Sequence, residues 1–264
     1  MTTERAEWLD LRDPTLYQRD PQDVWERLRD TDGLVRDRHG FVAMARFADL
    51  LAAERNAADL SSARGYRVHW EPEEHTMISQ DDPGHLAQRR RVSATLTPRA
   101  VAAHADDYRA LVVELVEAAL KEHEARGAVE VVDALAAPLP CRITARLIGF
   151  DEDDWPKVKS WSERQMRLDT RDVDPAIAED FMASINEWMM VMQEILPRRM
   201  ANPADDFFSR WLFPPDGQEP LEFNDMVMDA GLLIAGGAET TRTLIGHGLR
   251  TFCDHPDQWE LLST

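Results

Sequence analysis

Two adjacent glycines inside an apolar helical pattern are the feature that most constrains how this chain can fold. They lie in the run LLIAGGAETT at Leu232–Thr241, where an acid and two hydroxyls follow them directly. A glycine in a helix interior costs roughly 1 kcal/mol relative to alanine, and a carboxylate beside apolar residues is costly to bury without a partner. We therefore expect this segment to serve a site.

The pattern around the glycines predicts one long helix from about Asn224 to Cys253, roughly 45 Å in length. Its broad apolar stripe, spaced i, i+3, i+4, i+7, should face the core. A second strip carries Asp229, Gly236 and Thr240. Because helical side chains lean toward the N-terminus, Thr240 would overhang the space at Gly236 and form a notch with a hydroxyl on its rim. In the alternative, the glycines only permit a close helix crossing and Glu239 reaches solvent.

Charge and cysteine content narrow the function. The 264 residues include 49 acidic and 30 basic side chains, for a formal net charge of −19. Such a surface repels phosphate backbones and anionic lipid, so nucleic-acid binding is not expected. Cys141 and Cys253 are too far apart in sequence to suggest a disulfide framework or a metal cluster. Without a leader or a long apolar run, the chain is expected in the cytoplasm.

Helical patterns dominate the remaining sequence. Leu34–Val35 and Phe41–Met44 predict a hairpin, and Val129–Val132 predicts a further short strand. No internal repeat or interdomain linker is visible, so a single, mainly α domain with a small β-sheet is expected over residues 1–264. The stretch Ser61–Gln80 has no sustained period and is either a lid over a site or a mobile surface loop.

A second constellation lies earlier in the chain. In the run DDPGHLAQRRRV, Asp82 can cap a helix with Pro83 in its first turn, which places His85 and Arg89 on one face. Two cationic donors side by side are mildly destabilising unless an anion lies between them. Carboxylates of a bound cofactor would explain the pair; a solvated basic face is the alternative.

Together these motifs resemble a known family. The run from Asp82 to Arg89, the Thr97-Pro98-Arg99 turn and Gly236–Thr241 are similar to the C helix and I helix of soluble bacterial cytochromes P450. Three further phrases, MISQDDP, DALAAPLP and HPDQWELL, are most similar to actinobacterial steroid side-chain hydroxylases. The resemblance implies a cytochrome P450 fold and a haem-thiolate monooxygenase that uses O2 to hydroxylate an apolar small molecule, with a steroid side chain as one candidate.

The resemblance also implies roles for individual positions. Glu239 and Thr240 would deliver protons, and His85 and Arg89 would bind the haem propionates. Leu233, Gly236 and Gly237 would lie over the porphyrin of heme b, and the substrate would contact Ile78, Leu232, Ala235 and Thr240. Trp161, Met166, Trp188 and Met189 would either roof the substrate pocket or belong to the core.

The chain departs from the family in one decisive respect. The family holds its haem iron by a cysteine in a Phe-x-x-Gly-x-x-x-Cys-x-Gly loop after a Glu-x-x-Arg helix, and neither pattern completes a site here. The chain therefore looks like the N-terminal two-thirds of a cytochrome P450, truncated after the I helix, with no metal ligand of its own.

Two functions remain open from the sequence. The chain is either part of a haem monooxygenase whose remainder supplies the cysteine, or a haem-less helical remnant that binds a ligand or partner without catalysis. For the enzyme, the resemblance implies electrons from a ferredoxin and an NAD(P)H-dependent ferredoxin reductase. The ferredoxin would dock at Arg89–Arg91 and Arg99.

Overall fold

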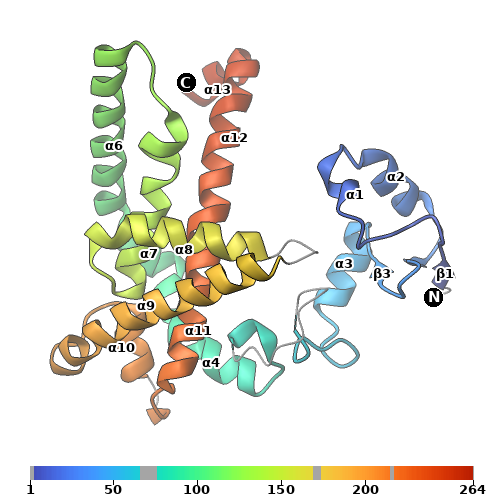
Figure 1. Ribbon diagram of the computed structural model, residues 1–264, viewed down its shortest axis with the longest axis horizontal. Helices are drawn as coiled ribbons and strands as arrows, with labels where there is room; N and C mark the ends of the chain where they lie inside the picture. Colours follow the sequence, from blue (N-terminus) through green and yellow to red (C-terminus); the bar gives the residue numbers. More distant parts are fainter. Residues whose placement is uncertain (1–2, 66–75, 169–173, 215–216, 264) are drawn as a thin grey trace. The chain divides into compact units, whose positions relative to one another are not determined.

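The computed structural model of the chain describes residues 3–65, 76–168, 174–214 and 217–263 (Figure 1). They form two units. The N-terminal unit contains residues 3–65 and 78–81, and the helical unit contains 76–77, 82–168, 174–214 and 217–263. The single domain expected over residues 1–264 stays a prediction. Residues 66–75 of the expected lid lie outside the described residues.

The N-terminal unit contains a small sheet of order β1-β2-β3. The expected hairpin is confirmed, because β2 (Leu34–Arg36) and β3 (Val42–Ala43) pair antiparallel. The sequence did not indicate β1 (Thr3–Arg5), which pairs parallel to β2. Buried aliphatic side chains join this sheet to α2 (Gln22–Asp30), with α1 (Thr15–Gln18) and α3 (Phe47–Glu54) completing the unit.

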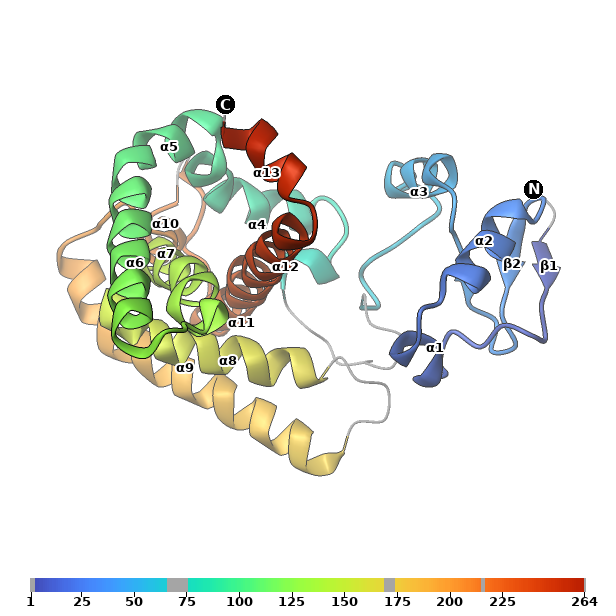
Figure 2. The same ribbon diagram turned by 90° about the horizontal axis from the view of Figure 1, so that it is seen from above.

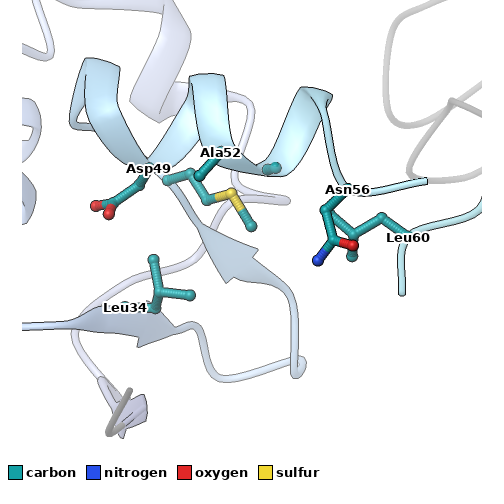
Figure 3. A pocket seen from close by; sticks show the side chains of 7 residues that line it. Leu34, Asp49, Ala52, Asn56 and Leu60 are labelled. Carbon is teal, nitrogen blue, oxygen red and sulfur yellow. The ribbon is translucent and has the colours of Figure 1, made fainter. Parts of the chain in front are cut away.

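A cavity of about 250 Å³ lies between α3 and the hairpin. Figure 3 shows Asp49, Ala52 and Asn56 on its α3 side, opposite Leu34 of β2. Its walls are mainly apolar, and none of the residues predicted to form the site lines it.

The helical unit is built from helices that follow one another with short connections. In chain order they are η1 (Met77–Ser79, of which Met77 belongs to this unit), α4 (Gly84–Ser93), η2 (Ala94–Leu96), α5 (Pro98–Ala103), α6 (Ala105–Arg126), η3 (Val132–Ala136), α7 (Pro138–Ile148), η4 (Glu152–Asp154), α8 (Trp155–Leu168), α9 (Pro175–Ala201), α10 (Phe207–Leu212), α11 (Phe223–Ile234), η6 (Ala235–Glu239), α12 (Thr240–Asp254) and α13 (Pro256–Ser263). The mainly α fold with a small sheet is therefore confirmed.

Two tryptophans centre the core of this unit, where α8 and α9 lie side by side (Figure 2). Trp161 and Trp188 are each 1% exposed and meet edge to face at 6.2 Å. The Trp188 indole N–H donates to the Val227 carbonyl at 3.0 Å, and a Cβ at Gly231 would lie 2.9 Å from its ring. The two tryptophans therefore belong to the core, which was one of the two readings of the sequence.

The long helix predicted over 224–253 is present, but it changes form at the glycines. Figure 1 shows α11 and α12 as one continuous path, and the turn between them, η6, is a π-helix. The apolar stripe is buried through Ala238. Beyond it the prediction was wrong, because no described residue of α12 is buried and Leu244 is 72% exposed.

The short strand predicted at Val129–Val132 was also wrong. Val132 begins the π-helical η3, and η3 packs against α6, α7 and α12 instead of extending a sheet. Valines favour strands only where a neighbouring strand is within reach. Among the described residues, no helix is both long and apolar enough to cross a membrane.

Candidate functional site

The two adjacent glycines have different surroundings. A Cβ at Gly237 would lie 2.5 Å from the Thr144 hydroxyl of α7, whereas a Cβ at Gly236 would meet nothing within 4 Å. The close-crossing reading therefore fits Gly237, and the open geometry fits Gly236, whose service to a site stays a prediction. Gly237 permits the close crossing of η6 and α7, and Gly236 leaves an open notch on the helix surface.

A cavity of about 240 Å³ lies beside this notch. Four residues singled out from the sequence line it, namely Leu232, Leu233, Gly236 and Gly237. Five others were not indicated by the sequence, because they come from α7, α10 and η2 far along the chain: Leu96, Thr144, Leu147, Ile148 and Phe207. Apart from the Thr144 hydroxyl, the lining side chains are apolar, so the cavity suits a hydrophobic surface.

Thr240 lies on the rim of the notch. Its hydroxyl donates to the Gly236 carbonyl at 2.8 Å, as the predicted overhang requires. The side chain is exposed, and a hydroxyl that donates one bond keeps lone pairs that can accept another. Thr240 can thus accept a hydrogen bond from a water held above Gly236.

Glu239 turns toward an ion-pair cluster with α8. Its carboxylate pairs with Arg242 at 2.6 Å, and Arg242 also pairs with Glu163 at 2.7 Å. Lys159 completes the cluster with a 3.1 Å contact to Glu163. Burial raises the pKa of Glu163, but the bonds from Lys159 and Arg242 outweigh it and hold the pKa below its ordinary value. Glu239 can therefore reach the notch only after it leaves Arg242.

His85 and Arg89 lie one turn apart on α4, as expected. The predicted cap was wrong, because the Asp82 side chain caps no backbone N–H of α4. Instead, its Oδ1 lies 3.1 Å from His85 Nδ1, which orients the imidazole. In the described part of the chain, no carboxylate lies within 4.0 Å of the Arg89 guanidinium.

The neighbouring arginines differ in their freedom to bind a partner. Arg91 is half-buried and donates to the backbone carbonyls of Ala87 and Glu219, each at 3.0 Å. Arg89 and Arg90 are exposed on the same helix, as is Arg99 on α5. Arg91 is therefore a structural residue of the predicted basic surface.

Asp229 is a buried acid that the sequence placed only on the second strip of the long helix. It is 0% exposed and accepts hydrogen bonds from Gln88 Nε2 at 2.7 Å and from the Met77 N–H at 3.0 Å. Burial raises the pKa of Asp229 to about 6, and the two hydrogen bonds limit the rise. Nearby charges act in opposite directions, since Asp225 raises the pKa further and Arg91 lowers it.

Two further residues predicted to contact the substrate, Ala235 and Ile78, are not among those that line the cavity. Ala235 is half-buried in η6 beside the cavity-lining residues but does not itself line the cavity. Ile78 belongs to the N-terminal unit, so its substrate role stays a prediction. Cys141 is buried in α7 and Cys253 is exposed near the end of α12.

Comparison with known proteins finds relatives over most of this chain. No family model matches the chain. Linalool 8-monooxygenase of Pseudomonas putida is 30% identical over 275 residues, which cover 96% of this chain and 66% of that protein. Steroid C26-monooxygenase of Mycobacterium tuberculosis strain H37Rv is 30% identical over 258 residues, covering 96% of this chain and 63% of that protein. The open form of cytochrome P450 Eryk from S. erythraea superimposes with a TM-score of 0.72 at 28% identity, covering 90% of this chain and 60% of that one.

The chain belongs to the cytochrome P450 family. It spans 66% of the length of the linalool monooxygenase, and 59%, 45% and 63% of the lengths of three steroid C26-monooxygenases that it matches. The family implies a haem, and the described residues fit one face of such a group. Gly236 leaves room for a flat ring to approach the backbone, and Leu232 and Leu233 supply apolar surface beside it.

The cysteines of this cytochrome P450 chain do not fit the axial position of a haem. Burial raises the pKa of the Cys141 thiol to about 12, which keeps it protonated, and it is 1% exposed. A cysteine binds a metal as the thiolate and not as the thiol. Cys253 is on α12, more than three turns beyond Gly236. Neither cysteine of the chain is therefore suited to hold haem iron at the notch.

Because Gly237 faces Thr144 and Gly236 faces open space, alanine at the two positions should affect stability differently. Gly237→Ala should destabilise the fold by about 1–3 kcal/mol, because the new Cβ meets the stiff, β-branched Thr144. Gly236→Ala should leave stability unchanged or raise it by up to about 1 kcal/mol. Urea unfolding measures both, and Gly237→Ala with Thr144→Ala should recover part of the loss. Equal costs at the two positions would contradict the assignment.

Asp229 predicts a specific pH dependence of stability. Its pKa is about 6 in the fold against 3.8 for the unperturbed group, so the folded chain holds the proton more tightly than the unfolded chain. The stability it contributes is complete at low pH and is lost as pH rises from about 4 to 6, by at most about 3 kcal/mol. Asp229→Asn removes this titration. The unfolding free energy of the variant minus that of the native chain should therefore rise over this range; a constant difference would refute the shift.

Proposed function

We propose that this chain is part of a haem-thiolate monooxygenase that hydroxylates an apolar small molecule. The observation that carries the proposal is the open notch at Gly236, with the Thr240 hydroxyl on its rim and an apolar cavity beside it. The relatives are named as monooxygenases of linalool and of steroids. The axial cysteine would come from residues outside these 264.

The chain's residues would hold the haem from one side. His85 and Arg89 present two donors to its carboxylates, with Asp82 orienting the imidazole. Leu233 and Gly236 would face the ring, and Gly237 holds their helix against α7. When bound, the haem iron supplies the activation of O2 and the oxidation of a C–H bond.

Thr240 and Glu239 would handle protons at this site. The Thr240 hydroxyl donates to the Gly236 carbonyl and would accept a hydrogen bond from a water that supplies the proton at the notch. The Glu239 carboxylate forms an ion pair with Arg242 and would relay protons once that pair opens. Exchange of that partner for water would connect Thr240 to solvent, and Thr243, whose hydroxyl lies 3.4 Å from Glu239, borders the same path.

The substrate would be apolar because the side chains that line the cavity, apart from Thr144, are apolar. Leu232 lines the cavity, and we propose Ala235 and Thr240 on the same helix as further substrate contacts, with Ile78 kept as predicted from the sequence. A steroid side chain is the candidate favoured by the steroid C26-monooxygenases among the relatives. Electrons would come from a ferredoxin and its NAD(P)H-dependent reductase. The ferredoxin would dock on Arg90 and Arg99, because Arg91 is engaged by backbone carbonyls and Arg89 would hold a propionate.

The absorption spectrum of the whole purified protein tests this function. After reduction and addition of CO, we expect the long-wavelength haem band characteristic of thiolate ligation. A whole protein that takes up no haem, or that holds haem without thiolate ligation, would refute the proposal and favour a ligand- or partner-binding helical protein.

Proton delivery by Thr240 is tested by the coupling of reductant to product. Thr240→Ala removes the hydroxyl at the notch, so product formed per NAD(P)H should fall by about tenfold or more. Thr251→Ala is the matched control, because Thr251 makes the same bond to the His247 carbonyl at 2.8 Å on α12. If both variants keep the native ratio, Thr240 has no such role.

A further inference from the structure

A single buried carboxylate joins three parts of the helical unit. Asp229 on α11 accepts from Gln88 on α4 and from the Met77 backbone just before it. The two bonds cross 141 and 152 residues of sequence, and both are buried. Two N–H donors therefore converge on one side chain, and an apolar residue in its place would leave both without an acceptor.

Gln88 and Asp229 lie on the two helices that carry the predicted site residues. Gln88 directly precedes Arg89 and lies three residues after His85 on α4. Asp229 lies two helical turns before Gly236, and therefore on the same face of the long helix. The Gln88–Asp229 bond thus connects the helix that carries the cationic pair to the helix that carries the notch.

Besides this bond, α4 packs against α10. Only Gln88 and Val92 of its ten residues are buried, and the polar residues around the helix leave it without an apolar face. Arg91 adds one bond to the Glu219 carbonyl at 3.0 Å. The polar contacts of Gln88 and Arg91 therefore add to the packing against α10 in fixing the orientation of α4.

We propose that Asp229 is a positioning residue that fixes α4, and with it His85 and Arg89, relative to the notch at Gly236. The connection to haem rests on the proposed function, because that function assigns His85 and Arg89 to the propionates. The positioning of α4 itself rests only on the hydrogen bonds.

Amide hydrogen exchange in this chain tests the positioning. Asp229→Ala and Gln88→Leu should each speed exchange of the α4 amides by about tenfold or more, because each removes the bond between α4 and α11. Asp229→Asn with Gln88→Glu exchanges acceptor and donor between the two positions. This double variant should return α4 exchange to within about threefold of the native rate. Ile234→Val, at a buried position on the same helix, controls for general loosening.

Haem affinity of the whole protein, measured by transfer of haem to an apo-globin, gives the second readout. Asp229→Ala and Gln88→Leu should weaken it by about tenfold, and the exchanged pair should restore it. Native-like α4 exchange in both single variants overturns the proposal, whether or not haem binds. Faster exchange with unchanged haem affinity overturns the role toward the cationic pair. Faster exchange, with rescue, in a protein that binds no haem supports the positioning and refutes the proposed function instead.

Discussion

The close approach of Gly237 to Thr144 is the contact on which the arrangement of the notch depends. Since a Cβ at Gly237 would lie 2.5 Å from the Thr144 hydroxyl, η6 can cross α7 only with a hydrogen in that position. The crossing fixes the rotation of the long helix, and this rotation turns Gly236 and Thr240 toward open space while Ala238 is buried. The π-helical form of η6 occurs at this crossing, and single π turns are common where a helix carries a function.

Polar contacts then set the chemistry around the crossing. On one side, Arg242 links Glu239 to Glu163 of α8, so the acid beside the notch is held at the helix surface. On the other, Asp229 accepts from α4 and from Met77 in a buried environment. Both carboxylates are on the long helix, Asp229 before the π turn and Glu239 at its last residue. The helix therefore organises its neighbours through side chains that no apolar pattern would reveal.

The sequence predicted features that depend on local pattern and missed those that depend on distant partners. The hairpin, the long helix and the Thr240 overhang follow from periodicity and side-chain direction, and they are present. Which glycine faces a neighbour depends on Thr144, which is more than ninety positions away, so the pattern alone left both readings open. The strand predicted at Val129–Val132 and the cap predicted at Asp82 were wrong because a helix and a histidine, respectively, offered other contacts.

A crystal structure of the whole protein loaded with haem tests the central claim most directly, namely that Gly236 receives the ring while Gly237 holds the helix against α7. The account predicts porphyrin atoms in van der Waals contact with the Gly236 backbone, with Thr144 still against Gly237 and Asp229 still bonded to Gln88. A porphyrin bound away from the Gly236 face, or a structure in which Thr144 has withdrawn from Gly237, would contradict it.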